Sequence, residues 1–239
     1  MKSIRLIFLI IILGCSQNLP VQTDILNSQK NDSKRIQSGL DVLLSEKMEL
    51  IKGKSIGLVT NNSGLDNKGI PNYKRLMKRK NVDLKIIFSP EHGLFGEAAD
   101  GEKVSYGQVE SFPEIISLYG DNRKPTIEQL SKLDLIIYDI QDIGARFYTY
   151  ISTLGLVMEA AAEANIKVIV LDRPNPINGI KIEGPILEMK HQSFVGYYPI
   201  PIRYGLTIGE LAKMINGENW IDKTPDLEVV PLKNWKRSL

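Results

Sequence analysis

Short apolar runs alternate with amphipathic stretches along most of the chain, and this alternation restricts the folds that the chain can adopt. Continuous apolar runs, typical of strands buried on both faces, lie at 56–60, 84–88, 135–140, 167–171 and 227–230. Stretches with the apolar spacing or the start signal of a helix lie between them, at 71–81, 126–133, 154–161 and 208–215. Strands of this kind, separated by helices, form parallel sheets. The sequence therefore predicts an α/β fold, a Rossmann-like parallel sheet with helices on both faces.

The chain opens with a short basic and apolar segment. Two basic residues precede an apolar run from Leu6 to Leu13. At about 1.5 Å per residue this run covers roughly 12 Å as a helix, far short of a ~30 Å hydrocarbon core, and it fits the apolar region of a secretory signal. The sequence Ile12-Leu13-Gly14-Cys15 resembles a bacterial lipobox. We expect residues 1–14 to be a lipoprotein signal peptide and Cys15 to be lipidated.

A polar segment follows the cysteine. Residues 15–35 are rich in Ser, Asn, Gln, Asp and Lys. Because such a composition buries little apolar surface, we expect a tether here, with a Rossmann-like catalytic domain over 36–239. The lipidated cysteine predicts a location in the cell envelope, where two or more acyl chains anchor the protein in a bacterial membrane at about 0.8 kcal/mol per buried CH₂.

The charge balance and the cysteine content exclude several classes of protein. The chain has 30 basic and 28 acidic residues, so it lacks the overall basic surplus of a nucleic-acid-binding protein. Its one cysteine rules out an internal disulfide framework and a cysteine-rich zinc site. Gly93-Leu94-Phe95-Gly96 has the wrong spacing for a nucleotide motif, and Gly53-Lys54-Ser55 precedes a strand instead of following one. We expect no cofactor and no nucleic-acid partner.

Polar side chains gather where the predicted strands end. In an open parallel sheet, ligands bind outside the carboxyl ends of the strands. Four predicted strands are followed by such segments, so we expect these segments to converge on one crevice. The candidate site residues are Asn61, Glu91, His92, Asp139, Asp142, Arg146, Tyr148, Tyr150, Asp172, Arg173, Asn175 and Glu183.

Glu91 lies in a Pro-Glu-His-Gly turn, where the chain is rigid before the glutamate and permissive after it. Two interpretations stay open: a general acid or base at the crevice, or a surface carboxylate that pairs with Arg146. His92 either orients Glu91, contacts a substrate, or satisfies carbonyl groups of its own loop.

The other candidates also leave alternatives open. Either Asp139 or Asp142 could cap the next helix while the other faces a ligand. Arg146 could clamp a substrate carboxylate or pair with a strand-end aspartate. Neighbouring Asp172 and Arg173 could bind substrate or neutralise each other. For the last four candidates, too, a functional and a structural interpretation stay open: they could contact a sugar, or they could serve ordinary packing or turn formation. These residues are Tyr148, Tyr150, Asn175 and Glu183.

The residue inventory favours carboxylate chemistry. The sequence has no Gly-x-Ser-x-Gly elbow, and its cysteine is assigned to lipidation, so a Ser or Cys nucleophile is disfavoured. No His-x-x-x-His or Asp-x-Asp pattern supports a metal site. Carboxylates surrounded by Arg, Asn and Tyr suit glycoside hydrolysis.

These segments resemble the NamZ-type exo-β-N-acetylmuramidases, glycoside hydrolase family 171, formerly a domain of unknown function. The resemblance runs from about residue 39 to the C-terminus, and its most specific part is Asp-Ile-Gln-Asp-Ile-Gly-Ala-Arg-Phe-Tyr-Thr-Tyr at 139–150. The other resembling stretches are 39–41, 57–61, 89–93, 171–176, 178–179 and 183–185.

The resemblance implies an enzyme that removes N-acetylmuramic acid from the non-reducing ends of peptidoglycan fragments. It makes Glu91 the leading catalytic candidate, and it gives Arg146 or Arg173 the lactyl carboxylate of the sugar to bind. The second catalytic group stays open between Asp139, Asp142 and the acetamido group of the substrate. Family members continue past Leu239, so we expect the second, C-terminal subdomain of the family to be largely missing from this chain.

Two other functions remain open at this point. A non-catalytic muropeptide-binding lipoprotein would use the same crevice without turnover. A metal-dependent hydrolase would use Glu91, His92 and Asp139.

Overall fold

The computed structural model describes residues 35–96 and 112–239. The contacts of the chain group Ile36–Leu239 into one packed unit. The predicted signal peptide, the lipidated Cys15 and nearly all of the tether lie outside the described residues. Among the helices of the described ranges, none is both long and apolar enough to span a bilayer.

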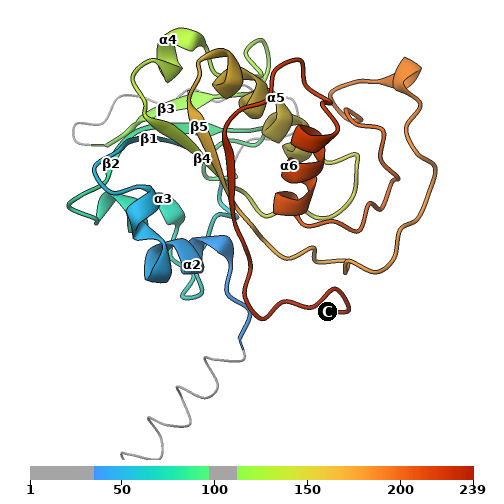
Figure 1. The fold of residues 1–239 in the computed structure, drawn as a ribbon, viewed down its shortest axis with the longest axis horizontal. Coiled ribbons are helices and arrows are strands. Elements are labelled where there is room, and N and C mark those ends of the chain that lie inside the picture. The colour runs from blue at the N-terminus through green and yellow to red at the C-terminus, as the bar shows by residue number, and fades with distance from the viewer. Residues whose placement is uncertain (1–34, 97–111) are drawn as a thin grey trace, which may run out of the picture. The chain divides into compact units, whose positions relative to one another are not determined.

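Within the described residues, six parallel strands form one sheet in the order β3-β2-β1-β4-β5-β6 (Figure 1). The strands are β1 (Ser55–Thr60), β2 (Asp83–Ser89), β3 (Glu114–Ser117), β4 (Leu135–Asp139), β5 (Lys167–Leu171) and β6 (Leu227–Val230). The predicted parallel sheet is confirmed, and five strands match the predicted apolar runs. β3 was not predicted, because this edge strand has four residues, none fully buried, and lacks a continuous apolar run.

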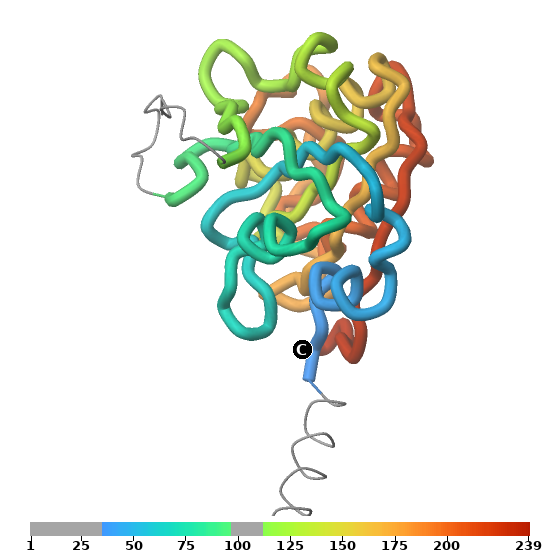
Figure 2. The backbone as a smooth tube through the Cα atoms, turned by 90° about the vertical axis from the view of Figure 1, so that its left-hand side faces the viewer, coloured from blue at the N-terminus to red at the C-terminus, as the bar shows by residue number. Residues whose placement is uncertain are grey.

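Helices cover both faces of the sheet, as predicted. The helices are α2 (Gly39–Glu46), α3 (Asn72–Met77), α4 (Ile127–Leu130), α5 (Tyr150–Glu163) and α6 (Ile208–Gly217), with short 3₁₀ turns η1 (Met48–Leu50) and η2 (Met189–His191). Apolar residues of α2 and α3 share one core cluster with the strands, and those of α4, α5 and α6 share the other. Figure 2 shows the side with α2 and α3 facing the viewer.

Helix ends follow local sequence signals. Thr126 starts α4 with a capping box: its hydroxyl accepts from the Gln129 N–H at 3.3 Å, and the Gln129 side chain accepts from the Thr126 N–H at 2.9 Å. The predicted helix over 71–81 is shorter than expected. α3 ends at Met77, because the next turn after buried Leu76 offers only charged side chains to the core.

A long segment joins β5 to α6 and contains only the short turn η2 (Figure 1). Glu183 and Arg203 close a ring in this segment through two backbone hydrogen bonds, of 3.1 and 2.9 Å, and a 2.7 Å ion pair. The segment presents seven large apolar side chains to solvent: Ile177, Ile180, Ile182, Ile186, Met189, Val195 and Ile202.

Candidate active site

Glu91 lies just past the carboxyl end of β2, in a turn that also contains left-handed backbone. It is half-buried, and the hydroxyl of Thr149 donates a hydrogen bond to its Oε2 at 2.9 Å. His92 and Gly93 have φ values of 69° and 75°, so two consecutive residues turn the chain sharply after the glutamate. The turn thereby separates Glu91 from the sheet and directs it to the start of α5.

Asn61 and Tyr150 lie beside this carboxylate. Asn61 follows β1 and is buried, and its Oδ1 accepts from the backbone N–H of Ser63 at 2.9 Å. Val59 of β1 pairs with Phe88 of β2, so Asn61 and Glu91 follow neighbouring strand ends, and Asn61 lies near the Tyr150 hydroxyl. Burial raises the pKa of the Tyr150 hydroxyl, and the nearby negative charge of Glu91 acts in the same direction. The tyrosine therefore stays protonated and can act as a hydrogen-bond donor.

Asp139 lies at the end of β4, fully buried, in a network of polar side chains. Arg173 donates from Nε to Oδ1 at 2.6 Å and from Nη2 to Oδ2 at 3.1 Å, and Asn72 donates to Oδ2 at 2.8 Å. Burial alone would lower the pKa of Arg173, but the charge of Asp139 raises it above its ordinary value. Both oxygens of Asp139 are therefore occupied inside the protein, and the strand-end aspartate pairs with Arg173 and not with Arg146.

Asp172 caps a helix and does not pair with the neighbouring guanidinium. Its Oδ1 accepts from the backbone N–H groups of Gly209 at 2.8 Å and Arg173 at 3.0 Å, and its Oδ2 accepts from the Thr207 hydroxyl at 3.0 Å. Burial raises the pKa of Asp172. Its place is the start of α6, where backbone N–H groups stabilise a carboxylate.

Asp142 is a buried residue of the loop that follows β4. Its Oδ2 accepts from the Gly144 N–H at 2.7 Å and from the Tyr204 hydroxyl, and its Oδ1 has no hydrogen-bond partner among the described residues. Burial raises the pKa of this carboxyl group. Asp142 thus ties the loop to the segment that precedes α6.

Arg146 also holds the long segment in place. Its guanidinium donates to the backbone carbonyl of Pro185 at 2.9 Å and to that of Ile200. These two carbonyls lie on opposite arms of the ring closed by Glu183 and Arg203. In this arrangement Arg146 contacts neither Glu91 nor Asp139 through any of its described hydrogen bonds.

The remaining candidates make other contacts. Asn175 donates to the Leu206 carbonyl at 2.9 Å and accepts from the Ile177 N–H at 3.1 Å, which is turn chemistry. Tyr148 is exposed, and its ring lies 5.6 Å from that of Phe147. Neither residue has a described contact with Glu91.

The structure therefore brings together three of the predicted residues, Asn61, Glu91 and Tyr150, with Thr149 as a fourth member that the sequence interpretation did not include. Threonine before a helical pattern usually caps the helix, so no sequence signal pointed to a hydrogen bond between Thr149 and Glu91. Within the described ranges, no group of three His, Cys, Asp or Glu side chains is placed to hold a metal ion.

The fold and the site define a class of protein: a parallel α/β domain with a half-buried glutamate held at the carboxyl edge of its sheet. The family described as "Exo-beta-N-acetylmuramidase NamZ, N-terminal" matches residues 56–239, and the chain belongs to this family. The family expected from the sequence is thereby confirmed.

Individual relatives agree with this assignment. The chain is 47% identical over 206 residues to the peptidoglycan beta-N-acetylmuramidase NamZ of Bacillus subtilis (strain 168), covering 86% of this chain and 49% of that protein. It is similar to crystal structures of two DUF1343 family proteins from Bacteroides fragilis NCTC 9343. One has a TM-score of 0.80 at 47% identity, and the other a TM-score of 0.73 at 37% identity. Each comparison covers 86% of this chain, and 52% and 54% of the respective relatives. The chain thus spans about half the length of these relatives.

Proposed function

We propose that this chain is the N-terminal catalytic part of an exo-β-N-acetylmuramidase, a glycoside hydrolase that releases N-acetylmuramic acid from the non-reducing ends of peptidoglycan fragments. The observation that carries the proposal is the position of Glu91, half-buried at the carboxyl edge of the sheet and hydrogen-bonded by Thr149. The 47% identity to a peptidoglycan beta-N-acetylmuramidase supports the substrate class.

In this proposal Glu91 is the general acid that protonates the departing glycosidic oxygen. Asp139 and Asp142 do not contact the sugar, because both are buried and bound to Arg173 and Tyr204 respectively. We assign to them the positioning of the loops after β4 and β5. The acetamido group of the substrate then assists at the anomeric carbon.

The Tyr150 hydroxyl and the Asn61 side chain lie beside the acid, and we assign to them hydrogen bonds to the bound sugar. The Tyr150 hydroxyl and the Asn61 amide are neutral hydrogen-bonding groups, which suit the hydroxyl and amide groups of an amino sugar. The buried guanidinium of Arg173 is ion-paired with Asp139. We therefore assign binding of the lactyl carboxylate to groups other than Arg173.

A glutamine substitution tests the role of Glu91. The Glu91→Gln chain keeps an acceptor for the Thr149 hydroxyl but has no proton to give, so hydrolysis of a chromogenic N-acetylmuramide is expected to fall by roughly 10²- to 10⁴-fold. Glu128→Gln, at an exposed position on α4, is the matched control and is expected to turn over normally. Near-normal turnover by Glu91→Gln would remove Glu91 from this role. If the wild-type chain binds N-acetylmuramic acid in a calorimetric titration but does not hydrolyse the substrate, the muropeptide-binding alternative replaces the proposal.

We also propose that the protein is held at a bacterial membrane by a lipid on Cys15. The lipobox-like sequence before this cysteine supports the proposal. Metabolic labelling with an alkyne fatty acid is expected to label the wild-type protein and not Cys15→Ser. Equal labelling of both proteins would contradict the anchor.

A further inference from the structure

The charges of this chain are strongly segregated, although its net charge is only +2. The two segments 47–54 and 74–85 hold nine basic residues and two acidic ones. The rest of the chain therefore holds 21 basic and 26 acidic residues, an acidic balance. A concentration of one sign of charge in two segments 20 positions apart points to a shared surface.

The structure places the two segments side by side. The Gly53 N–H donates to the Asn81 carbonyl at 2.7 Å, and the Asp83 N–H donates to the Lys54 carbonyl at 3.1 Å. Lys52 and Lys80 line the same shallow pocket. We name this surface the basic edge and define it by Lys52, Lys54, Lys78, Arg79 and Lys80.

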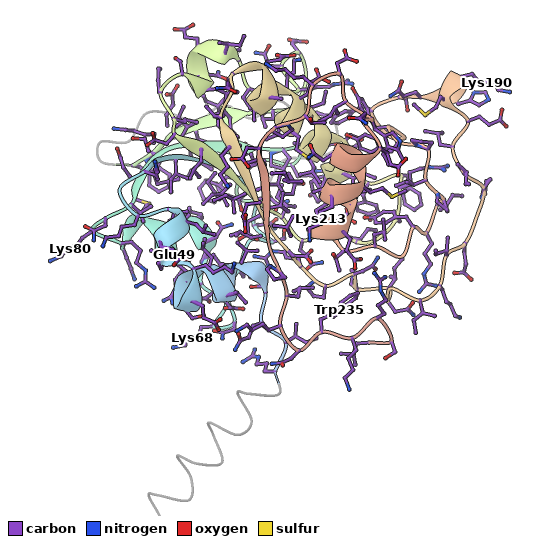
Figure 3. The ribbon with its side chains drawn as sticks, in the orientation of Figure 1. Glu49, Lys68, Lys80, Lys190, Lys213 and Trp235 are labelled. Atoms are coloured by element: carbon purple, nitrogen blue, oxygen red, sulfur yellow. The ribbon has the colours of Figure 1, made fainter. Side chains whose placement is uncertain are left out.

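The side chains of the basic edge are available to a partner. All of its lysines are exposed, and Figure 3 shows Lys80 pointing away from the body of the protein. Among the ion pairs described for residues 35–96 and 112–239, none involves a residue of the basic edge. The two nearby acids are Asp83, which pairs with Lys85 at 3.0 Å, and the exposed Glu49. The positive charge is thus uncompensated by these neighbours.

The basic edge lies at the opposite end of the strands from the candidate site. Lys52 and Lys54 come just before β1, and Lys78 to Lys80 come just before β2, so they mark the amino ends of the strands. Asn61 and Glu91 follow the carboxyl ends of the same two strands. At about 3.3 Å per residue, the six residues of β1 separate the two edges by roughly 20 Å.

We propose that the basic edge docks on the anionic phospholipid surface of the membrane, and that this contact turns the candidate site away from the bilayer. A cluster of flexible, strongly hydrated lysines suits a fluid layer of phosphate head groups, because each contact is a point charge without fixed geometry. The proposal rests on the proposed envelope location but not on the proposed hydrolysis, since docking requires no turnover.

Vesicle binding by the full chain tests the docking. The chain is made unlipidated as Cys15→Ser, and its apolar run at 6–13 then contributes equally to all variants. We compare Lys52→Gln/Lys78→Gln/Lys80→Gln with Lys68→Gln/Lys181→Gln/Lys236→Gln, a control that removes three exposed lysines from segments that follow the carboxyl ends of β1, β5 and β6. Each lysine near an anionic bilayer adds about fivefold to binding, ~1 kcal/mol. The first variant is expected to bind phosphatidylglycerol-containing vesicles at least tenfold more weakly than the control.

The same comparison on pure phosphatidylcholine vesicles is expected to show no difference, and added salt is expected to remove the difference on anionic vesicles. Equal binding by the two triple variants would overturn the proposal. So would a loss confined to a soluble poly(glycerol phosphate) chain, which would assign the basic edge to an anionic wall polymer.

Depth-dependent quenching tests the orientation. A fluorophore is attached in the Cys15→Ser background at Asn81→Cys, on the basic edge, or at Phe147→Cys, an exposed position after β4. Lipids with nitroxide head groups are expected to quench the first fluorophore and to leave the second unquenched. Equal quenching of both, or stronger quenching at position 147, would contradict the orientation whether or not the protein hydrolyses a substrate.

Discussion

The hydroxyl of Thr149 donates to Glu91 Oε2 across 2.9 Å, and these two residues are 58 positions apart in the sequence. Thr149 occupies the N-cap position of α5, yet its side chain makes no capping hydrogen bond with that helix. Its hydroxyl is hydrogen-bonded to the Glu91 carboxylate instead. A hydroxyl both donates to a carboxylate and accepts from a carboxylic acid, so this contact holds Glu91 in either protonation state.

Removing this hydroxyl is expected to impair turnover with little effect on substrate binding. Thr149→Val keeps the shape of the side chain but cannot form the hydrogen bond, so kcat is expected to fall roughly tenfold while KM stays within about twofold. Thr149→Ser keeps the hydroxyl and is expected to restore most of the activity. Steady-state kinetics on a chromogenic N-acetylmuramide measures both. A serine variant as impaired as the valine variant would indicate a packing role for Thr149.

Removing the charge of Asp139 is expected to destabilise the fold strongly. Asp139→Asn leaves the guanidinium of Arg173 buried without its counter-charge, which typically costs about 3–5 kcal/mol. The control is Glu188→Gln, which breaks the exposed pair with Lys190 and is expected to change stability by less than about 0.5 kcal/mol. Urea unfolding gives both values. Equal costs would show that the buried pair contributes no more than a surface pair.

Position 144 requires glycine for two reasons: its backbone conformation is left-handed, and a side chain there would clash with Asn175. Gly144 has φ +81°, and a Cβ there would lie 2.4 Å from Oδ1 of Asn175. Gly69 has φ +73° and no atom within 4 Å of its Cβ position. Gly69→Ala is therefore expected to cost only the backbone term of about 1–2 kcal/mol, and Gly144→Ala clearly more. Thermal unfolding of the two variants checks this order, and equal shifts in Tm would show that Asn175 moves away freely.

The buried carboxyl of Asp142 is expected to make stability depend on pH. Burial raises its pKa above the ordinary value of 3.8, so the folded state keeps this proton to higher pH than the unfolded chain does. Between the two pKa values the folded state binds more protons, and its stability falls as pH rises. Asp142→Asn lacks this contribution. The free energy of unfolding of the variant minus that of the wild type is therefore expected to increase from about pH 4 upward and then level off above the folded-state pKa.

Urea unfolding of both proteins across this pH range measures the difference. Any constant effect of the amide, including a poor fit at the position of the unpartnered Oδ1, cancels from the slope. A difference that stays flat with pH would mean that Asp142 titrates alike in the folded and unfolded states.

The architecture was predictable from the sequence because the four inner strands, β1, β2, β4 and β5, are largely apolar and mostly buried. β3 escaped prediction because it has only two apolar residues, between Glu114 and Ser117, whereas three of the four residues of β6, the other edge strand, are apolar. The pattern of charges did not predict where α3 ends. Basic residues 78–80 extend the polar pattern of the outer face, but the last residue that α3 buries in the core is Leu76, and the helix ends at Met77.

The sequence predicted where the site lies but not which of its residues contact one another. Parallel strands bring Asn61 and Glu91 to one edge whatever the strand order, so their convergence follows from fold class. The choice between Arg146 and Arg173 as partner of Asp139 does depend on strand order. β4 and β5 are neighbours, which puts Arg173 next to Asp139, and the sequence pattern does not contain that adjacency. Thr149 illustrates the same limit, because the target of its hydroxyl lies on a distant strand end.

The position of β1 in the middle of the sheet has a consequence for how the chain folds. β1 pairs with β2, its neighbour in the sequence, but its other edge pairs with β4, where Asp139 lies 79 positions after Thr60. A chain in which only β1 and β2 have paired exposes apolar side chains and unpaired backbone groups, the kind of surface that aggregates. Closure of the sheet thus depends on long-range contacts, which form slowly, and a chain cut between Ser89 and Leu135 lacks the strand that covers the open edge of β1.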